Sequence, residues 1–247
     1  MDVLVEACVD SVASALAAER GGAGRLELCA NLFDGGTTPS AGMLSAVKAA
    51  VRIPVYIIVR PRGGGFVYTH DEMGVMRLDI EAARMLGADG VVVGPLTRDA
   101  QVDEEQLRTL VTAARDLPVT FHRAFDLTRD LDQALEALIR HGVSRVLTSG
   151  GATTALIGVG QISALARRAA GQIVVMAGGG VREESVQEIV HRSGVREVHV
   201  RGAREVYGST PISPTGITLR KPFPTDERAW EETDERRIRE FVRLANG

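Results

Sequence analysis

The sequence predicts a single domain of the α/β class, a (β/α)8 TIM barrel, and three observations support this. The first is its length, because 247 residues are a common size for one such barrel. The second is a recurring unit in which a helical pattern ends at a glycine and continues into a short apolar strand. The third is that these strands are nearly continuous in Val, Ile and Leu, as strands buried on both faces are.

Two types of strand alternate along the chain, and helical spacing follows them. Four strands follow a helix-ending glycine, within residues 22–28, 87–93, 142–147 and 194–200. The other four are expected at 3–6, 55–60, 119–122 and 173–176. The helices are expected at 11–20, 41–50, 71–86, 103–115, 131–140, 154–169 and 183–193. Eight alternations of strand and helix favour a closed barrel, and a doubly wound open sheet is the alternative.

The barrel is expected to occupy residues 1–204, with 205–247 as an appended segment. Residues 207–224 are rich in Ser, Thr, Gly and Pro, which indicates a loop or a partly disordered excursion. Residues 234–244 regain helical spacing, through Ile238, Phe241, Val242 and Leu244. This last helix is expected either to close the barrel or to form a subunit contact.

Composition excludes several classes of partner. The net charge is -3 with both signs mixed along the chain, so no basic surface for nucleic acid is expected. No apolar run reaches the ~18 residues that a membrane span needs. The first residues lack the pattern of a signal peptide. Two cysteines are too few for a disulfide framework, which favours a cytoplasmic protein with reduced thiols.

Acidic and imidazole side chains stand where several strands end, which is the working face of a parallel barrel. His122 has Asp126 close behind it, and an imidazole near a carboxylate can act as an acid or base. The alternative is that these groups are solvated, ion-paired or part of the core. The opposite strand ends are expected to hold fewer such groups. The candidate catalytic residues are Glu6, Glu27, His122, Asp126 and His199.

Glycine-rich turns after the sixth and seventh strands favour a site for a small anion. Bare amides at the start of a helix attract negative charge, and arginines on the same face would add hydrogen bonds. The alternative is that these are tight turns that need glycine. The candidate anion-binding residues are Arg60, Arg62, Arg123, Ser149, Gly150, Gly151, Gly178, Gly179, Gly180 and Arg201.

Cys8 and Cys29 follow adjacent strands, so their thiols are expected to lie close together. Two thiolates suit a soft ion such as Cu(I), and ligands of one ion should lie within about 4 Å of each other. The alternative is that both are small buried core residues. His122 with two glutamates would suit Zn or Mn, although no ligand spacing motif supports such a site.

Six sequence blocks resemble the CutC family of copper homeostasis proteins, over about residues 3–199. They are ELCANL at 27–32, GGTTPS at 35–40, RPRGG at 60–64, FHRAFD at 121–126, LTSGG at 147–151 and MAGGG at 176–180. The resemblance implies a cytoplasmic TIM barrel, often a homo-oligomer, with a role in copper tolerance or trafficking. It also implies that the cysteines are the Cu(I) ligands.

Two departures from the family pattern change the charge of one rim. Gly65 stands where the family commonly has Asp, and Val200 and Arg201 stand where it tends to small residues. The changes favour anionic ligands. Two functions therefore remain open: Cu(I) binding at the cysteines, or an enzyme that acts on a small anionic or sugar-like metabolite at the barrel mouth.

Overall fold

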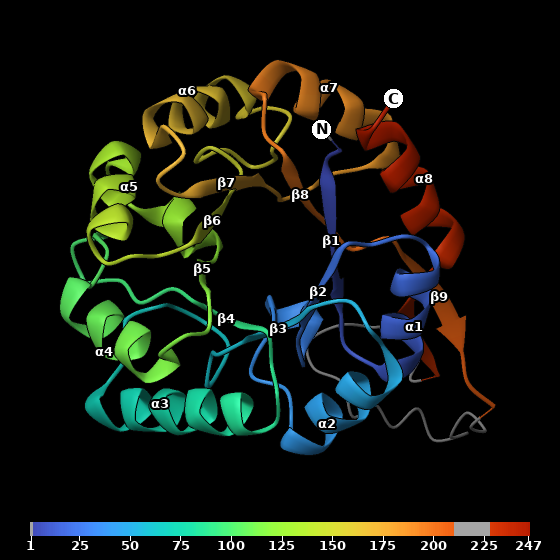
Figure 1. Cartoon of the computed structure of the whole chain (residues 1–247), viewed down its shortest axis with the longest axis horizontal. Helices are drawn as coiled ribbons and strands as arrows, with labels where there is room; N and C mark the ends of the chain where they lie inside the picture. Colours follow the sequence, from blue (N-terminus) through green and yellow to red (C-terminus); the bar gives the residue numbers. More distant parts are fainter. Residues whose placement is uncertain (1, 210–227) are drawn as a thin grey trace, which may run out of the picture.

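The structure, a computed structural model, describes residues 2–209 and 228–247 and contains a closed barrel of eight parallel strands (Figure 1). Each strand pairs with the next, and β8 pairs with β1 to close the ring. The strands are β1 (Leu4–Val9), β2 (Arg25–Leu28), β3 (Val55–Ile58), β4 (Gly90–Val93), β5 (Val119–Phe121), β6 (Arg145–Thr148), β7 (Val174–Ala177) and β8 (Glu197–Val200). The predicted (β/α)8 barrel is confirmed, and the open sheet is excluded.

Helices form the outer layer around this ring (Figure 1). They are α1 (Val12–Arg20), α2 (Ala41–Ala50), α3 (His70–Met85), α4 (Glu104–Ala114), α5 (Leu131–Arg140), α6 (Val159–Ala169), α7 (Glu183–Ser193) and α8 (Glu235–Ala245). Side chains of Ser11, Ser40 and Asp103 accept amide hydrogen bonds and so start their helices. The predicted helix start at 154 is wrong, because the segment before α6 turns toward the β7 end and the Ala155 amide donates to the Gly179 carbonyl.

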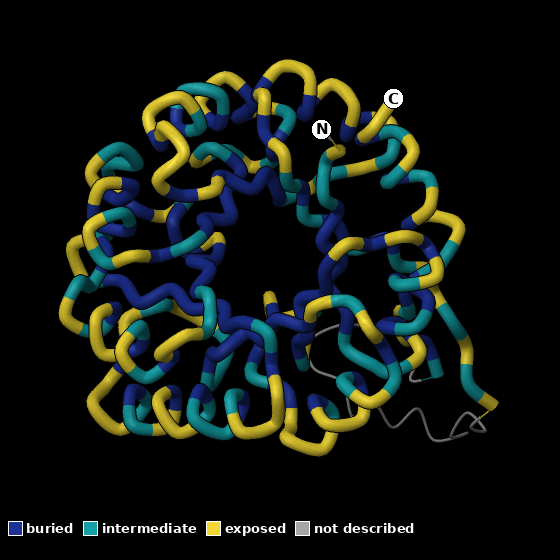
Figure 2. Tube along the Cα trace, in the orientation of Figure 1, coloured by how far each residue is buried: buried dark blue, intermediate teal, exposed yellow. Residues whose placement is uncertain are grey.

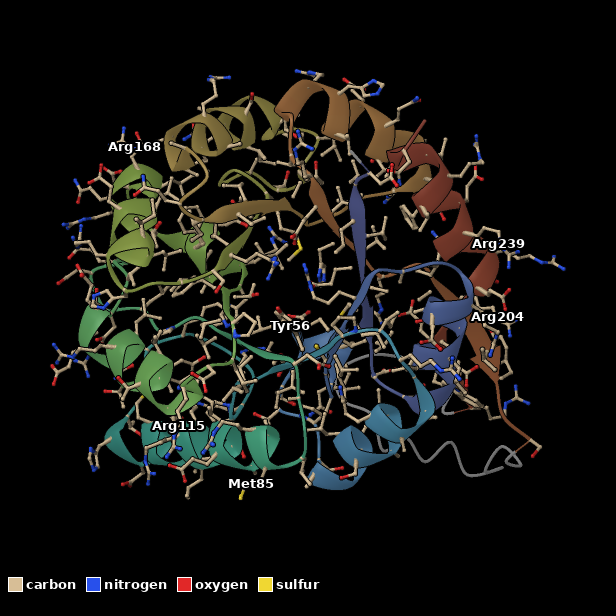
Figure 3. The ribbon with its side chains drawn as sticks, viewed as in Figure 1. Tyr56, Met85, Arg115, Arg168, Arg204 and Arg239 are labelled. Carbon is tan, nitrogen blue, oxygen red and sulfur yellow. The ribbon has the colours of Figure 1, made fainter. Side chains whose placement is uncertain are left out.

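Strand residues alternate between two packing environments. Val5, Ala7 and Val9 of β1 face the helices and belong to one large core. Side chains on the inward positions form a separate small cluster inside the ring, made of Cys8, Cys29, Tyr56, Ile58 and Val92. Figure 2 shows the buried ring of strands within a shell that is exposed on its outside, and Figure 3 shows Tyr56 near the centre of that ring.

A buried ion-pair network occupies the inside of the ring near the start of the strands. Arg25 pairs with Glu6 and with Glu197, and Arg145 pairs with the same Glu197. Both guanidinium groups lie over the ring of Tyr56, at 5.1 and 5.6 Å from its centroid. The expectation that this end holds few polar groups is therefore wrong. Arg25, Arg145 and Glu197 are the first residues of their strands and meet inside the barrel.

The C-terminal segment adds a hairpin and the eighth helix. β9 (Ala203–Tyr207) and β10 (Ala229–Thr233) pair in antiparallel fashion beside α1 (Figure 1). The sequence did not predict these strands, and the part of the predicted loop at 210–224 lies outside the described residues. The predicted helix at 234–244 is confirmed as α8, which packs against α1, α7 and β1. Among the described helices, none is long and apolar enough to cross a membrane.

Candidate functional site

A cavity of about 340 Å³ opens at the end of the barrel where the strands finish. Ten of the residues that the sequence singled out line it, namely Cys8, Glu27, Cys29, Arg60, His122, Arg123, Gly179, Gly180, His199 and Arg201. They lie on β1, β2 and β8 or follow directly after β2, β3, β5, β7 and β8. The strand ends therefore converge on one mouth, as the strand order of a closed parallel barrel requires.

Two thiols and a carboxylate form a compact buried group on one wall of the cavity. The Cys8 and Cys29 sulfur atoms lie 3.7 Å apart, and the Cys29 sulfur lies 3.7 Å from Oε2 of Glu27. Their potential ligand atoms all lie within 4.8 Å of one another. The register explains this grouping, because Cys8 of β1 lies directly opposite Glu27 of β2. The expected distance between the thiols, within about 4 Å, is therefore met.

Protonation is divided unequally within this group. The hydrogen bond from Cys29 lowers the pKa of the Cys8 thiol to about 5, although burial opposes this, and His199 adds to the lowering. The same bond and burial raise the pKa of Cys29 well above its usual value. Burial raises the pKa of Glu27 to about 8, because the attraction of His199 only partly offsets it. Burial therefore favours the protonated forms of Cys29 and Glu27, while the hydrogen bond from Cys29 favours the thiolate of Cys8.

His199 connects the thiols to the ion-pair network below. Its Nδ1 lies 2.8 Å from Oε1 of Glu6, and its Nε2 lies 3.6 Å from Oε2 of Glu27. Burial opposes a charged imidazole, but Glu27, Cys8 and Glu6 together raise the pKa of His199 well above its usual value. Burial likewise opposes a charged Glu6, yet His199 and Arg25 lower its pKa to about 2. Glu6 lies beneath His199 and does not line the cavity, unlike the other candidate residues on this wall.

His122 occupies another part of the wall, at the end of β5. Its Nδ1 accepts a hydrogen bond from the Ala124 amide, so a neutral ring carries its proton on Nε2. Burial, with the nearby charge of Arg60, lowers its pKa to about 3 and keeps the ring neutral. The ring fits because Gly94 has no side chain, since a Cβ there would lie 2.1 Å from Cε1 of His122.

Arg60 is a buried cation at the end of β3. Its Nη1 donates to the carbonyls of Asp34 and Gly36, both at 2.8 Å, and its Nη2 donates to the Gly64 carbonyl at 2.7 Å. Its guanidinium group also lies 5.0 Å from the ring centroid of Phe66. Arg60 thus fastens the turns after β2 and β3 to the mouth while its charge faces the cavity region.

Asp126 does not hydrogen-bond to His122, although the sequence analysis expected its carboxylate to act beside that imidazole. Its carboxylate accepts hydrogen bonds from the Ser149 and Gly151 amides and from the Ser149 and Thr148 hydroxyls. Arg123 donates to both Asp126 and the Ser149 hydroxyl, at 2.8 and 2.9 Å. The amides of this turn are therefore used within the protein: Gly151 by Asp126 and Gly150 by the Thr148 hydroxyl.

The glycine turn after β7 keeps two of its three amides free. Gly178 donates to the Thr148 carbonyl, whereas Gly179 and Gly180 donate to no other described residue. Gly179 has a φ of 97°, which favours glycine, and a Cβ there would lie 2.7 Å from Cζ of Arg123. The guanidinium group of Arg123 therefore lies against Gly179.

Two of the arginines predicted to bind an anion form ion pairs with carboxylates of the protein itself. Arg62 does not line the cavity, because it pairs with Glu72 and donates to the Gly65 and Val67 carbonyls. Arg201 does line it, but its Nη2 lies 2.5 Å from a carboxylate oxygen of Glu231 on β10. The positive charge of Arg201, which departs from the family pattern, is therefore balanced by the carboxylate of Glu231. Within the described ranges, the candidate metal group does not include His122, so the Zn or Mn alternative gains no support.

Sequence reasoning missed several residues that shape the site. Arg25, Arg145 and Glu197 hold the network under His199, and Phe66 contacts both Arg60 and His122, with its ring 4.9 Å from that of His122. The alternation of side chains along a strand could have identified Arg25 and Glu197, because Arg25 and Glu27 flank Leu26, just as Glu197 and His199 flank Val198. No comparable sequence pattern identifies Phe66, which lies in a loop.

Fold and site together define a single-domain (β/α)8 barrel whose mouth carries a buried thiol pair next to a cavity. The sequence model of the CutC family matches residues 3–204, and the chain belongs to that family. It is 45% identical to the copper homeostasis protein cutC homolog of Mus musculus and 44% identical to that of Homo sapiens, each over 242 residues. Both alignments cover 98% of this chain and 89% of the relative.

Solved structures agree with this assignment. The crystal structure of CutC from Streptococcus agalactiae matches with a TM-score of 0.77 at 34% identity, and the match covers 80% of this chain and 97% of that one. Phosphoribosylanthranilate isomerase from Thermotoga maritima matches with a TM-score of 0.60 at 14% identity, covering 98% of both chains. The latter likeness shows the barrel fold alone.

Proposed function

We propose that the protein binds one Cu(I) ion through the sulfur atoms of Cys8 and Cys29, as part of copper homeostasis in a reducing cytoplasm. The observation that carries the proposal is the distance of 3.7 Å between the two sulfurs. Metal–sulfur bonds of about 2.3 Å at a tetrahedral angle separate two sulfurs by roughly 3.8 Å, so one ion fits between them with little movement.

The chemistry of the donors supports a soft monovalent ion. Thiolates select Cu(I) and Zn over hard cations, and the lowered pKa of Cys8 supplies one thiolate near neutral pH. Binding would also release the proton that Cys29 holds, because ligand sulfurs are deprotonated. Glu27 offers a third oxygen ligand at the same place. The copper homeostasis homologues point to the same ion.

The test is a Cu(I) titration of the full chain under anaerobic, reducing conditions against a chromophoric competitor. We expect one ion per chain, and Cys8→Ser or Cys29→Ser to weaken binding at least tenfold. Met85→Leu removes a sulfur that is 77% exposed on α3 and should leave affinity unchanged. Wild-type affinity in Cys29→Ser would contradict the proposal, and so would tighter binding of Zn²⁺ than of Cu(I) in a parallel titration.

A further inference from the structure

One buried cation, Arg60, lines the cavity near the end of β3. It is 4% exposed and forms no ion pair with any residue of the described ranges. A buried cation whose partners are carbonyl dipoles and one aromatic ring favours an anion nearby.

Two buried N–H groups in the same part of the wall lack acceptors. Within the described residues, Nε of Arg60 and Nε2 of His122 are buried and have no hydrogen-bond partner. Both side chains line the cavity and both contact the ring of Phe66. A buried donor without an acceptor costs about 1–3 kcal/mol, so a ligand oxygen that reaches these groups would recover that cost.

The turn after β7 supplies donors on the far side of the ring from Arg60. β7 lies opposite β3 in a closed ring of eight strands, and Gly179 and Gly180 line the cavity there. Arg123 lies against Gly179 and is anchored by Asp126 and Ser149. Amides beside a guanidinium group are suited to phosphate oxygens.

We propose that this cavity binds a small organic phosphate monoester. Its phosphate would lie at Gly179, Gly180 and Arg123, and an oxygen at its other end would accept from His122 and Arg60. About 340 Å³ lies within the usual size range of small-molecule sites, roughly 300–1,000 Å³. The donors follow β3, β5 and β7, whereas the thiols lie on β1 and directly after β2. This site is therefore separate from the proposed copper ligands, although both face one cavity.

The experiment is calorimetric titration of the full chain with glycerol 3-phosphate, inorganic phosphate and glycerol, together with thermal unfolding in each. We expect glycerol 3-phosphate to bind and raise Tm, inorganic phosphate to bind at least tenfold more weakly, and glycerol to give no signal. His122→Phe keeps an aromatic ring but removes the donor, and Arg123→Gln removes a cation whose side chain is 42% exposed. Each should weaken glycerol 3-phosphate binding at least tenfold.

Two control variants test whether binding depends on this part of the cavity. Arg108→Gln removes a cation of α4 that lines a different surface hollow and should leave binding unchanged. Arg168→Gln removes an exposed cation of α6 and should also retain glycerol 3-phosphate binding. All these titrations are run without copper, so failure of the copper proposal would not mimic failure here. The proposal is overturned if glycerol 3-phosphate gives no heat and no rise in Tm. It is equally overturned if Arg123→Gln binds like the wild type, or if Arg108→Gln weakens binding as much as Arg123→Gln does.

Discussion

The carboxylate of Asp126 accepts a hydrogen bond from the backbone amide of Gly151 at 3.1 Å, across the gap between the turns after β5 and β6. The protein's own anion thus fills the amide-lined turn after β6 that sequence reasoning had assigned to a ligand. Asp126 also holds Arg123, which lies at the cavity. The carboxylate of Asp126 therefore links the turns after β5 and β6 and also positions Arg123.

Asp126→Ala should lower the free energy of unfolding by about 2–3 kcal/mol. The substitution leaves the Ser149 and Gly151 amides without their charged acceptor, and hydrogen bonds to charged groups contribute about 1.5–3 kcal/mol. Urea denaturation at neutral pH measures the loss. Asp99→Ala, at an exposed position, should change stability by no more than about 0.5 kcal/mol. Equal effects of the two substitutions would show that Asp126 is no more than a surface charge.

Arg25→Met should destabilise the protein by about 3–5 kcal/mol. It strands the buried carboxylates of Glu6 and Glu197, and removal of one partner from a buried ion pair costs about that much. Arg77→Met breaks an exposed pair with Glu81 and should cost only about 0–1 kcal/mol. Chemical denaturation of both variants gives the comparison. A loss below about 1 kcal/mol for Arg25→Met would mean that the network is not needed for folding.

Cys8 should react with iodoacetamide well below the pH at which ordinary thiols react. Its pKa of about 5 leaves it as a thiolate at pH 6, whereas a free cysteine has a pKa of about 8.5. The pH profile of alkylation, followed by mass spectrometry, should show Cys8 modified first and Cys29 protected. Cys29→Ala removes the main hydrogen bond and should move the Cys8 profile upward by more than one pH unit. Identical profiles for Cys8 in the two proteins would show that Cys29 does not lower the pKa of Cys8.

Stability should fall below pH 6.5 in part because of His122. Its pKa is about 3 in the folded protein and about 6.5 when unfolded, so between these values only the unfolded chain binds the proton. The free energy of unfolding therefore rises with pH across this window, by up to about 1.4 kcal/mol per unit, and is fully present above pH 6.5. Between pH 6.5 and 5 this residue accounts for about 1.6 kcal/mol.

Urea denaturation of wild type and His122→Phe at pH 6.5 and pH 5 measures this contribution. The variant should lose about 1.6 kcal/mol less than the wild type over the interval, because carboxylates and other histidines titrate alike in both. Parallel losses in the two proteins would show that His122 is not held neutral by burial.

Local patterns predicted most of the architecture. Helices at 41–50, 131–140 and 183–193 match the structure, because capping residues and apolar spacing act within one turn of the chain. The position of the mouth could also be predicted from the sequence, because all strands of a parallel barrel end on the same side. The distance between the two sulfurs followed from the adjacency of β1 and β2.

Pairings between distant residues were beyond such reasoning. Arg25 and Glu197 are 172 positions apart, and only closure of the ring brings them together. Asp126 stands four residues after His122 in sequence, yet its carboxylate meets the turn after β6 because the five-residue 3-10 helix at Arg123–Leu127 directs it there. The hairpin of β9 and β10 joins segments on either side of residues 210–227, so no short-range turn signal marks it.

The pairing of β1 with β8 has a consequence for the order of events during protein synthesis. β1 leaves the ribosome first, but the partner on one of its edges is separated by 193 positions, as with Glu6 and His199. Until β8 has been synthesised, Cys8 lacks its neighbour His199 and the ring of strands stays open beside β1. A growing chain therefore presents the proposed metal site in incomplete form, and we expect loading of the sulfur pair to follow completion of the ring.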